Sequence, residues 1–324
     1  MDLEQYNAFY NTSRFNLCSI QKKTADIPCS KIAKKIQRPL LDFLSVGSEV
    51  VKQLSDKGKI IRAATRSASD NTFRNLNSVR VVQLDYNNPG TLATAFKGVE
   101  KLFLLTPPQS TTVDFTSNLV REAKKAGVKY IVKHSVLGAD ADPGISPTPI
   151  RLHRQAEKII EESKIPFTFL RSNSYMQNFV NFYSHSVKTQ GAFYVPAGDA
   201  RISFVDVRDI AAIAVDALTS TNGKHEGKAH IITGGEALSH GQAAEILSEQ
   251  LGKKVNYINV SDEDARKGMK DMGMDEWIIN SIIELFEFAK AGHWSTISPV
   301  TEQLTGNKPI SFSQFASDNA ASFK

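Results

Sequence analysis

Lys101-Leu-Phe-Leu-Leu-Thr106 decides the fold, together with the segment Tyr130-Ile-Val-Lys-His-Ser135. Each is a short, mostly apolar run of the kind that forms a strand covered on both faces. Pro107 and Pro108 end the first run, and a helical pattern from Asp114 to Ala126 leads to the second. Strands that alternate with helices of this length imply right-handed crossovers. The two segments therefore predict an α/β fold built on a doubly wound, Rossmann-like parallel sheet.

The alternation continues on both sides of these segments. Strands are expected at 59–66, 79–84 and 167–170, and helices at 48–57, through 92–96 and at 152–163. After Arg171 the pattern changes: residues 172–200 are rich in loop signals, and a strand is expected at Arg201–Val207. Further helices are predicted at 209–218, 242–251, 264–272 and 276–291, and further strands at 230–233 and 255–260. These later elements predict a smaller carboxyl-terminal lobe that covers the ligand region.

The composition bounds the class of protein. With 324 residues, 41% of them hydrophobic, the chain can bury a large core. No apolar run approaches the roughly 20 residues that span a bilayer, so we expect a soluble protein without a membrane partner. The net charge is +5, of which residues 1–45 carry +3, and this small surplus does not indicate a nucleic-acid partner. Two cysteines, without metal-ligand spacing, predict no metal and a reducing, cytoplasmic compartment.

Six segments and the ending of the sequence carry a resemblance to a known family. The segments are Ala63-Ala-Thr-Arg66, Leu102-Phe-Leu-Leu-Thr-Pro-Pro108, Ala126-Gly-Val-Lys-Tyr-Ile-Val-Lys-His-Ser135, Leu152-His-Arg-Gln-Ala-Glu157, Phe167-Thr-Phe-Leu-Arg-Ser-Asn-Ser-Tyr-Met-Gln-Asn178 and Ile202-Ser-Phe-Val-Asp-Val-Arg-Asp-Ile210, and the ending is Leu304-Thr-Gly-Asn-Lys-Pro309 with Phe312 and Phe315. In this order and spacing they resemble the NmrA-like family of atypical short-chain dehydrogenases/reductases, near its NADPH:quinone reductase and azoreductase-like members. The resemblance covers residues 46–324. It implies NAD(P)H-dependent reduction of a small quinone-like or azo acceptor by direct hydride transfer.

Arg66 is the first residue expected to bind the cofactor. At the end of the second strand of a dinucleotide fold, an arginine accommodates the 2′-phosphate of NADP, where an acid would bind the 2′-hydroxyl of NAD. The expected cofactor is therefore NADPH, with NADH as an option, although a solvated arginine at a strand end is the other interpretation. Asp85 follows the third strand, at a position that the resemblance places beside the adenine. A turn-forming aspartate explains it nearly as well.

The carboxyl ends of the next strands predict the nicotinamide half of the site, because ligands bind there in open α/β sheets. Cofactor contacts are expected from Leu105, Thr106, Pro107 and His134, although a buried histidine bonded to the backbone also explains His134. The resemblance places Ser135 near the nicotinamide, in a hydrogen-bonding role. It also implies that the loop after the sixth strand lines the acceptor pocket with Asn173, Tyr175 and Asn178.

The acid pair of typical short-chain reductases is missing. Counted back from Glu157, the Tyr-x-x-x-Lys pair falls on Pro149 and His153. Reduction of a ketone needs an acid for the developing alkoxide, whereas reduction of a quinone gives a delocalised, weakly basic phenolate. The loss therefore favours quinone-like acceptors, or redox sensing without turnover. His153 contacts the nicotinamide ribose or an acceptor oxygen, or else is a half-buried helix histidine.

The phosphate loop that opens such a fold is altered. Gly47-Ser-Glu-Val-Val51 matches the end of the family's Gly-x-x-Gly-x-x-Gly loop, which puts the first two glycines at Leu41 and Leu44. A leucine Cβ obstructs the backbone approach to pyrophosphate. The preceding strand would be 34–40, which contains Pro39 and three charges, or a surrogate at 40–44.

The sequence is therefore expected to divide into two parts. We expect residues 1–45 to be an atypical, partly disordered segment. We expect residues 46–324 to form the NAD(P)-binding domain, with its substrate lobe mainly at 172–200 and 235–324. Two alternatives to the reductase remain. The chain is a non-catalytic NADP(H) sensor that binds a regulatory protein, or a variant with impaired cofactor binding. The sequence does not indicate an oligomeric state.

Overall fold

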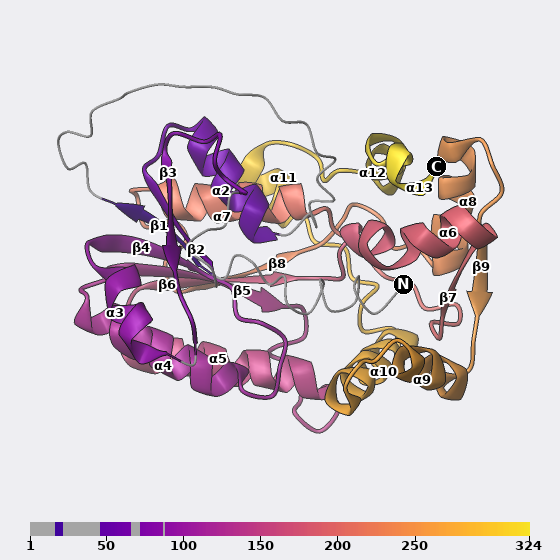
Figure 1. Ribbon diagram of the computed structural model, residues 1–324, viewed down its shortest axis with the longest axis horizontal. Helices are drawn as coiled ribbons and strands as arrows, with labels where there is room; N and C mark the ends of the chain where they lie inside the picture. Colours follow the sequence, from indigo (N-terminus) through magenta and orange to yellow (C-terminus); the bar gives the residue numbers. More distant parts are fainter. Residues whose placement is uncertain (1–16, 22–45, 66–71, 87) are drawn as a thin grey trace.

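A computed structural model describes residues 17–21, 46–65, 72–86 and 88–324, and its centre is a seven-stranded sheet (Figure 1). The strand order is β3-β2-β1-β4-β5-β6-β8, which begins with the order of a dinucleotide-binding fold. The predicted α/β class is therefore confirmed. The strands are β1 (Leu17–Gln21), β2 (Ile61–Thr65), β3 (Val79–Gln83), β4 (Val99–Leu104), β5 (Tyr130–Val136), β6 (Phe167–Ser172) and β8 (Lys228–Ile232).

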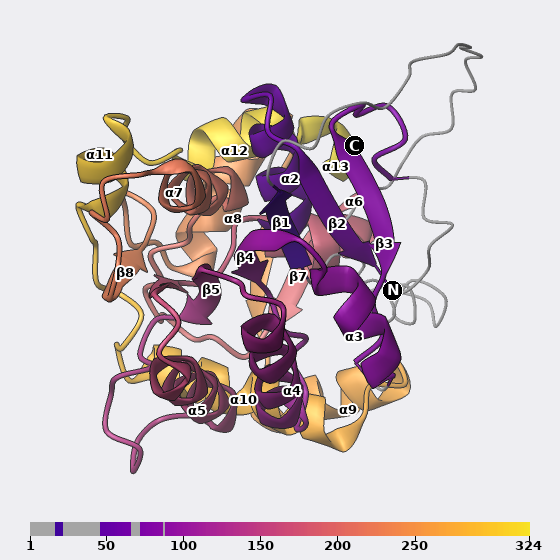
Figure 2. The ribbon, with the colours of Figure 1, turned by 90° about the vertical axis from the view of Figure 1, so that its left-hand side faces the viewer.

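Helices cover both faces of this sheet (Figure 2). One layer contains α2 (Val46–Asp56), α7 (Val207–Thr219) and α11 (Val300–Thr305), and the other contains α3 (Pro89–Phe96), α4 (Thr112–Lys125) and α5 (Thr148–Ser163). Successive side chains of a strand point to opposite faces, so Ile131 and Val132 of β5 belong to the two different cores. Both are fully buried. Burial of each such side chain stabilises the fold by about 1.5–3 kcal/mol.

The central strand runs in the opposite direction to the others. Strand β1 pairs antiparallel with both neighbours, so that Ser19 lies opposite Arg62 of β2 and Leu102 of β4, while the other neighbouring strands of the sheet pair in parallel. The expectation of an all-parallel sheet is wrong at this strand. The segments 34–40 and 40–44, which we considered for this place, lie outside the described residues.

A physical reason explains the reversal. A strand presents N–H and C=O groups along both of its edges in either direction, so the slot between β2 and β4 accepts an antiparallel segment. Leu17-Cys-Ser-Ile-Gln21 contains neither proline nor charge, unlike residues 34–40. Gln21 pairs with Val99, at the start of β4, so β1 ends at the edge where its neighbours begin. The carboxyl end of β1 is therefore absent from the edge at which a dinucleotide fold places it.

A second, smaller lobe contains the parallel pair β7 (Ala192–Val195) and β9 (Asn256–Asn259). Its helices are the π-helix η1 (Phe179–Tyr183), α6 (Ser184–Gln190), α8 (His240–Leu251), α9 (Asp262–Asp271), α10 (Glu276–Lys290), α12 (Phe312–Asp318) and α13 (Ala320–Phe323). Phe179 lies at the centre of its core, edge-to-face with Phe193, Phe204 and Phe312. This packing of aromatic rings stabilises the lobe beyond simple area burial.

Two expectations for this lobe are wrong. Residues 172–200 are not mainly loop, because η1, α6 and β7 lie within them. The strand expected at 201–207 consists only of isolated bridges, from Ile202 to Leu238 and from Val205 to Tyr175. Between them the Ser203 amide donates to the Trp294 carbonyl. Each of these residues therefore pairs with a different segment, and no single neighbouring strand runs alongside.

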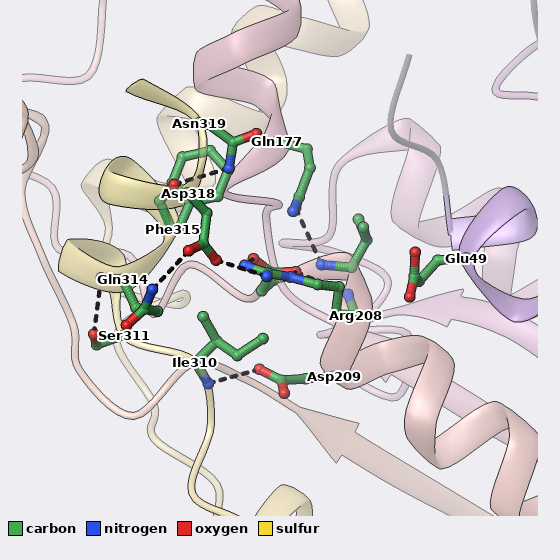
Figure 3. Close-up of polar contacts among 12 residues, drawn as sticks. Glu49, Gln177, Arg208, Asp209, Ile310, Ser311, Gln314, Phe315, Asp318 and Asn319 are labelled. Atoms are coloured by element: carbon green, nitrogen blue, oxygen red, sulfur yellow. Dashed lines mark hydrogen bonds and ion pairs between the residues drawn. The ribbon is translucent and has the colours of Figure 1, made fainter. Parts of the chain in front are cut away.

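A charged contact joins the two parts of the molecule (Figure 3). Arg208, in the first turn of α7, lies 2.8 Å from Asp206 and 2.7 Å from Asp318 of α12. The next residue, Asp209, accepts a hydrogen bond of 2.9 Å from the Ile310 amide. On its other side, the Arg208 carbonyl accepts from Gln53 of α2. The amino end of α7 thereby holds both the helix that precedes β2 and the carboxyl-terminal helices.

Candidate active site

Polar side chains gather where β4, β5 and β6 end. Leu104 pairs with Lys133 and His134 pairs with Leu170, so the residues that follow these positions meet at one edge of the sheet. Thr106, two residues after β4, is buried, and its hydroxyl has no hydrogen-bond partner among the described residues. A buried hydroxyl without a partner costs about 1–3 kcal/mol, so this group is free to bond to a ligand or to water.

His134 and Tyr175 form a coupled pair on the α2 and α7 side of β5. The Nε2 atom of His134 lies 2.9 Å from the Tyr175 hydroxyl and 3.1 Å from the Ser172 hydroxyl. Burial, with Lys133 beside it, lowers the pKa of His134 to about 3. Burial also raises the pKa of Tyr175 to about 12. The imidazole is therefore neutral and the phenol protonated at pH 7, so the pair offers hydrogen bonds and not charge.

Lys133 and His153 form a second couple on the α5 side of the same strand. Lys133 is completely buried. Its Nζ atom donates to the His134 carbonyl at 2.8 Å and lies 3.0 Å from His153 Nδ1. Burial lowers the pKa of Lys133 to about 8, against the opposing influence of Glu157. Burial and the nearby Lys133 hold the pKa of His153 well below its ordinary value.

Lys133 was not among the predicted site residues, because the Tyr-x-x-x-Lys spacing places the lysine of the acid pair on α5 and not on a strand. The side chain instead reaches α5 from the neighbouring strand. One signal was available: a lysine in a run expected to be covered on both faces must find a partner inside.

Glu157 organises the polar groups beneath this couple. It is completely buried, and it accepts a hydrogen bond of 2.7 Å from Ser135 and two from Arg171, at 3.1 and 2.8 Å. Arg154 contacts the same carboxylate at 3.0 Å. Burial raises the pKa of Glu157, but the hydrogen bonds from Arg171 and Ser135 outweigh it and hold the pKa below its ordinary value. The Ser135 hydroxyl is thereby directed into the interface between sheet and helix.

The other predicted residues are placed as follows. Asn173 is buried, and its amide donates to Ser203 Oγ and to the Trp294 carbonyl, both at 2.8 Å. Asn178, half-buried, immediately precedes η1. Asp85 follows β3, where the Thr91 hydroxyl accepts from the Asp85 amide and so closes a turn. Arg66, Leu41 and Leu44 lie outside the described residues, so the predictions for them stay predictions.

The two residues beside Thr106 differ in exposure: Leu105 is half-buried and Pro107 is buried. Gly47 is buried in the first turn of α2. Because α2 ends just before β2 begins, its first turn lies at the carboxyl edge of the sheet, about 16 Å from its last residue.

Within the part of the chain that the structure describes, no group of three or more histidine, cysteine, aspartate or glutamate residues is placed to hold a metal ion. The same part contains no helix long and apolar enough to cross a membrane.

Comparison with known proteins identifies the family. A model of the NmrA-like family matches residues 45–314. The chain belongs to the NmrA-like family. An NmrA-like relative, the NAD(P)H azoreductase of Xenophilus azovorans, is 33% identical over 282 residues, which cover 86% of this chain and 96% of the relative.

Two solved structures extend this family likeness. The NADPH-dependent quinone oxidoreductase of Escherichia coli, complexed with NADPH, has a TM-score of 0.75 at 27% identity and covers 85% of this chain and 96% of its own. The triphenylmethane reductase of a Citrobacter species, complexed with NADP(H), has a TM-score of 0.74 at 26% identity, with 86% and 97% covered. The chain is thus related to NAD(P)H-dependent oxidoreductases, as the resemblance predicted.

The described residues fit the nicotinamide half of such a cofactor. The unpartnered Thr106 hydroxyl and the Tyr175 and His134 pair meet at the edge where these folds bind a dinucleotide. The amino end of α2 lies at the same edge and is suited to a phosphate. The pyrophosphate half differs, because the reversed β1 ends at the opposite edge.

Proposed function

We propose that this chain reduces quinone-like or azo acceptors by direct hydride transfer from NADPH, with NADH as a weaker donor. The observation that carries the proposal is the unpartnered, buried Thr106 hydroxyl, which follows β4 at the same edge of the sheet as the His134 and Tyr175 pair. The relatives named as azoreductase and quinone oxidoreductase support the acceptor class. The bound dinucleotide supplies the hydride, and the chain binds, orients and shields the reactants.

In this proposal, the cofactor lies across the edge formed by Gly47, Asp85, Leu105, Thr106, Pro107 and His134, with Arg66 at the 2′-phosphate.

Tyr175 and Asn178 face the acceptor, and Asn173 holds their loop through Ser203 and Trp294. Ser135 acts through Glu157 as a positioning residue. His153, which occupies the position of the lysine in the missing acid pair, is the catalytic residue. The smaller lobe, 172–200 and 235–324, covers the acceptor, and residues 46–324 form the binding domain.

The acceptor class follows from α5. Pro149, in the place of the usual tyrosine, has no proton to donate. An acceptor whose reduced form is a stabilised anion is therefore favoured over a simple ketone. We expect rapid turnover with quinones and azo dyes, and slow turnover with ketones and secondary alcohols.

One specific observation favours the alternative of impaired cofactor binding. The reversed β1 cannot supply the turn that leads from the central strand to a phosphate-binding helix at the carboxyl edge. A variant with residues 35–46 replaced by an apolar strand and a Gly-x-x-Gly-x-x loop separates the two cases. If the chain as written is impaired, this variant binds NADPH much more tightly.

Binding and turnover together test the proposal. The melting temperature is measured with NADPH and with NADH, and cofactor oxidation is measured with a quinone, an azo dye and a ketone. We expect a larger upward shift with NADPH, and Arg66→Ala to remove most of that preference, since a charge-assisted phosphate contact contributes roughly 1.5–3 kcal/mol. Equal shifts for the two cofactors would refute the role of Arg66, and rapid reduction of the ketone would refute the acceptor class.

A further inference from the structure

Lys133 is a buried cation without a part in the function proposed above. Its side chain is 0% exposed in the interface between β5 and α5. The pairing of β4 with β5 ends at Leu104 and Lys133, and the Lys133 ammonium caps the His134 carbonyl one residue further on. Its other contact among the described residues is His153 Nδ1, at 3.0 Å. A buried lysine is retained at a cost in desolvation, so its placement calls for an explanation.

The chemistry of the contact fixes the state of the imidazole. An ammonium group has three donors and no acceptor, so His153 Nδ1 must accept. The ring proton then lies on Nε2, and the described residues provide no hydrogen-bond partner for that atom. Because the pKa of His153 lies well below its ordinary value, the ring is neutral at pH 7. His153 thus presents a single N–H donor from a half-buried position on α5.

We propose that Lys133 is the positioning residue that makes His153 a proton donor toward the acceptor, so that the two together replace the acid pair missing from α5. This inference rests on the proposed function and deepens it. It explains how a chain with Pro149 in place of a phenol supplies the proton of the reaction. Lys133 lies on β5 and not on α5, and the proton donor is an imidazole nitrogen of His153 and not a phenol.

The proton balance closes through these two side chains. Reduction of a quinone to a hydroquinone adds one hydride, which the reduced cofactor would supply, and one proton, which the anionic oxygen left by hydride transfer takes up. As the acceptor oxygen gains its proton from His153 Nε2, Nδ1 takes a proton from Lys133 Nζ, which becomes a neutral amine. After the product leaves, water delivers a proton to Nε2 and the Nδ1 proton returns to Lys133. The net change is one hydride and one proton added to the acceptor.

Charged and titratable groups face Lys133 from each neighbouring element. Glu157, on α5, favours its charged form, and Arg171, on β6, opposes it. His153 lies on α5 and His134 on β5 itself, and both rings are neutral at pH 7. With burial as the largest influence, the pKa of Lys133 is about 8. We therefore expect turnover to fall as the pH rises through about 8, because the neutral amine has no ammonium proton to pass to Nδ1.

Lys133→Met tests the inference, with Lys158→Met as its matched control. Lys158 is an exposed lysine on the outer face of α5, so its loss leaves the interface intact. Imidazole ¹⁵N NMR of the full chain reports the tautomer of His153 without cofactor or turnover. We expect the Nε2–H tautomer in the unaltered chain and in the control, and a mixture or the Nδ1–H form in Lys133→Met. The Nδ1–H form in the unaltered chain would overturn the inference, as would an unchanged tautomer in Lys133→Met.

Lys133→Arg provides the second variant, in case loss of the cation prevents folding. A guanidinium also only donates, but it does not titrate near pH 8. We expect this variant to keep the Nε2–H tautomer, to turn over more slowly because a guanidinium does not release a proton to Nδ1, and to show no further fall in kcat above pH 8. Lys133→Met is expected to lose about tenfold or more in kcat with a quinone at pH 7, with little change in the KM for NADPH. An unaltered fall above pH 8 in Lys133→Arg would also overturn the inference.

Failure of the proposed function remains distinguishable from failure of this inference. If the unaltered chain oxidises no NADPH with any acceptor, the proposed function fails, and the NMR measurement still decides whether Lys133 sets the tautomer of His153. If the chain turns over but the tautomer and pH profile do not depend on Lys133, the inference alone fails.

Discussion

Replacement of Ser19 by proline tests the position of the reversed central strand. Ser19 lies in the middle of β1, is 4% exposed, and pairs with Arg62 on one side and Leu102 on the other. Proline has no N–H to donate to a ladder, and it is found in sheets almost only at edges and bulges. Because β1 has a neighbour on each side, the substitution cannot be accommodated as at an edge strand.

The expected loss follows from these contacts. Ser19→Pro removes one ladder hydrogen bond and leaves a buried carbonyl unpaired, at about 1–3 kcal/mol, and the ring adds a steric cost against the neighbouring strand. We expect the free energy of unfolding to fall by about 3 kcal/mol in total. In a domain of this size, that loss lowers the melting temperature by roughly 4–5 °C.

Calorimetry and urea unfolding of three proteins measure the effect: the unaltered chain, Ser19→Pro and Ser19→Ala. The alanine variant keeps the backbone N–H and serves as the control, with an expected change below about 1 kcal/mol. Equal melting temperatures for the proline and alanine variants would show that residues 17–21 do not occupy the centre of the sheet. Residues 17–21 would then not be the cause of an altered cofactor-binding edge.

Three further predictions concern the polar groups of the site and its supports. Glu157→Gln should lower the free energy of unfolding by about 3 kcal/mol in urea, because it takes the buried Glu157 carboxylate away from Arg171 and leaves the exposed Asp140 as partner, and unchanged stability would contradict the buried pair. Thr106→Val should raise the melting temperature of the free protein while weakening NADPH binding, measured by calorimetry, and equal affinity would exclude Thr106 from the site. Burial raises the pKa of Asp209 from 3.8 to about 6, so the stability supplied by its protonated form is present below pH 3.8 and is lost as the pH rises through 6. Asp209→Asn should therefore be more stable at pH 7, by roughly 2 kcal/mol, and should vary less between pH 4 and 6, whereas a parallel pH profile would contradict this burial.

The sequence predicted the sheet and its covering helices well from Val46 to Ser172. Apolar runs such as 130–135 and helical repeats such as 152–163 follow local periods that tertiary contacts do not override. Helix ends were off by a few residues: α5 begins at Thr148, where Pro149 occupies the first turn without loss of a hydrogen bond. Such boundaries depend on capping contacts that the period alone does not contain.

The remaining features depend on contacts between distant segments. The five residues of β1 carry too little pattern to indicate a strand, and their direction is decided by the slot between β2 and β4. The contact between Lys133 and His153 joins residues 20 positions apart on different elements, so no motif spacing contains it. The segment at 201–207 looked like a strand by composition, but its partners lie on three separate segments. The unpaired Thr106 hydroxyl, likewise, follows from the final packing.

A single-turnover experiment without oxygen tests the central claim most directly. The purified full chain is mixed with a limiting amount of NADPH and an excess of a simple quinone, and both NADPH and hydroquinone are followed in time. The account predicts that one hydroquinone forms for each NADPH consumed, far faster than in a mixture without protein. A protein that NADPH stabilises but that leaves both reactants unchanged would contradict the account and identify a sensor. A protein that NADPH neither stabilises nor reacts with would show that the reversed central strand has abolished the cofactor site.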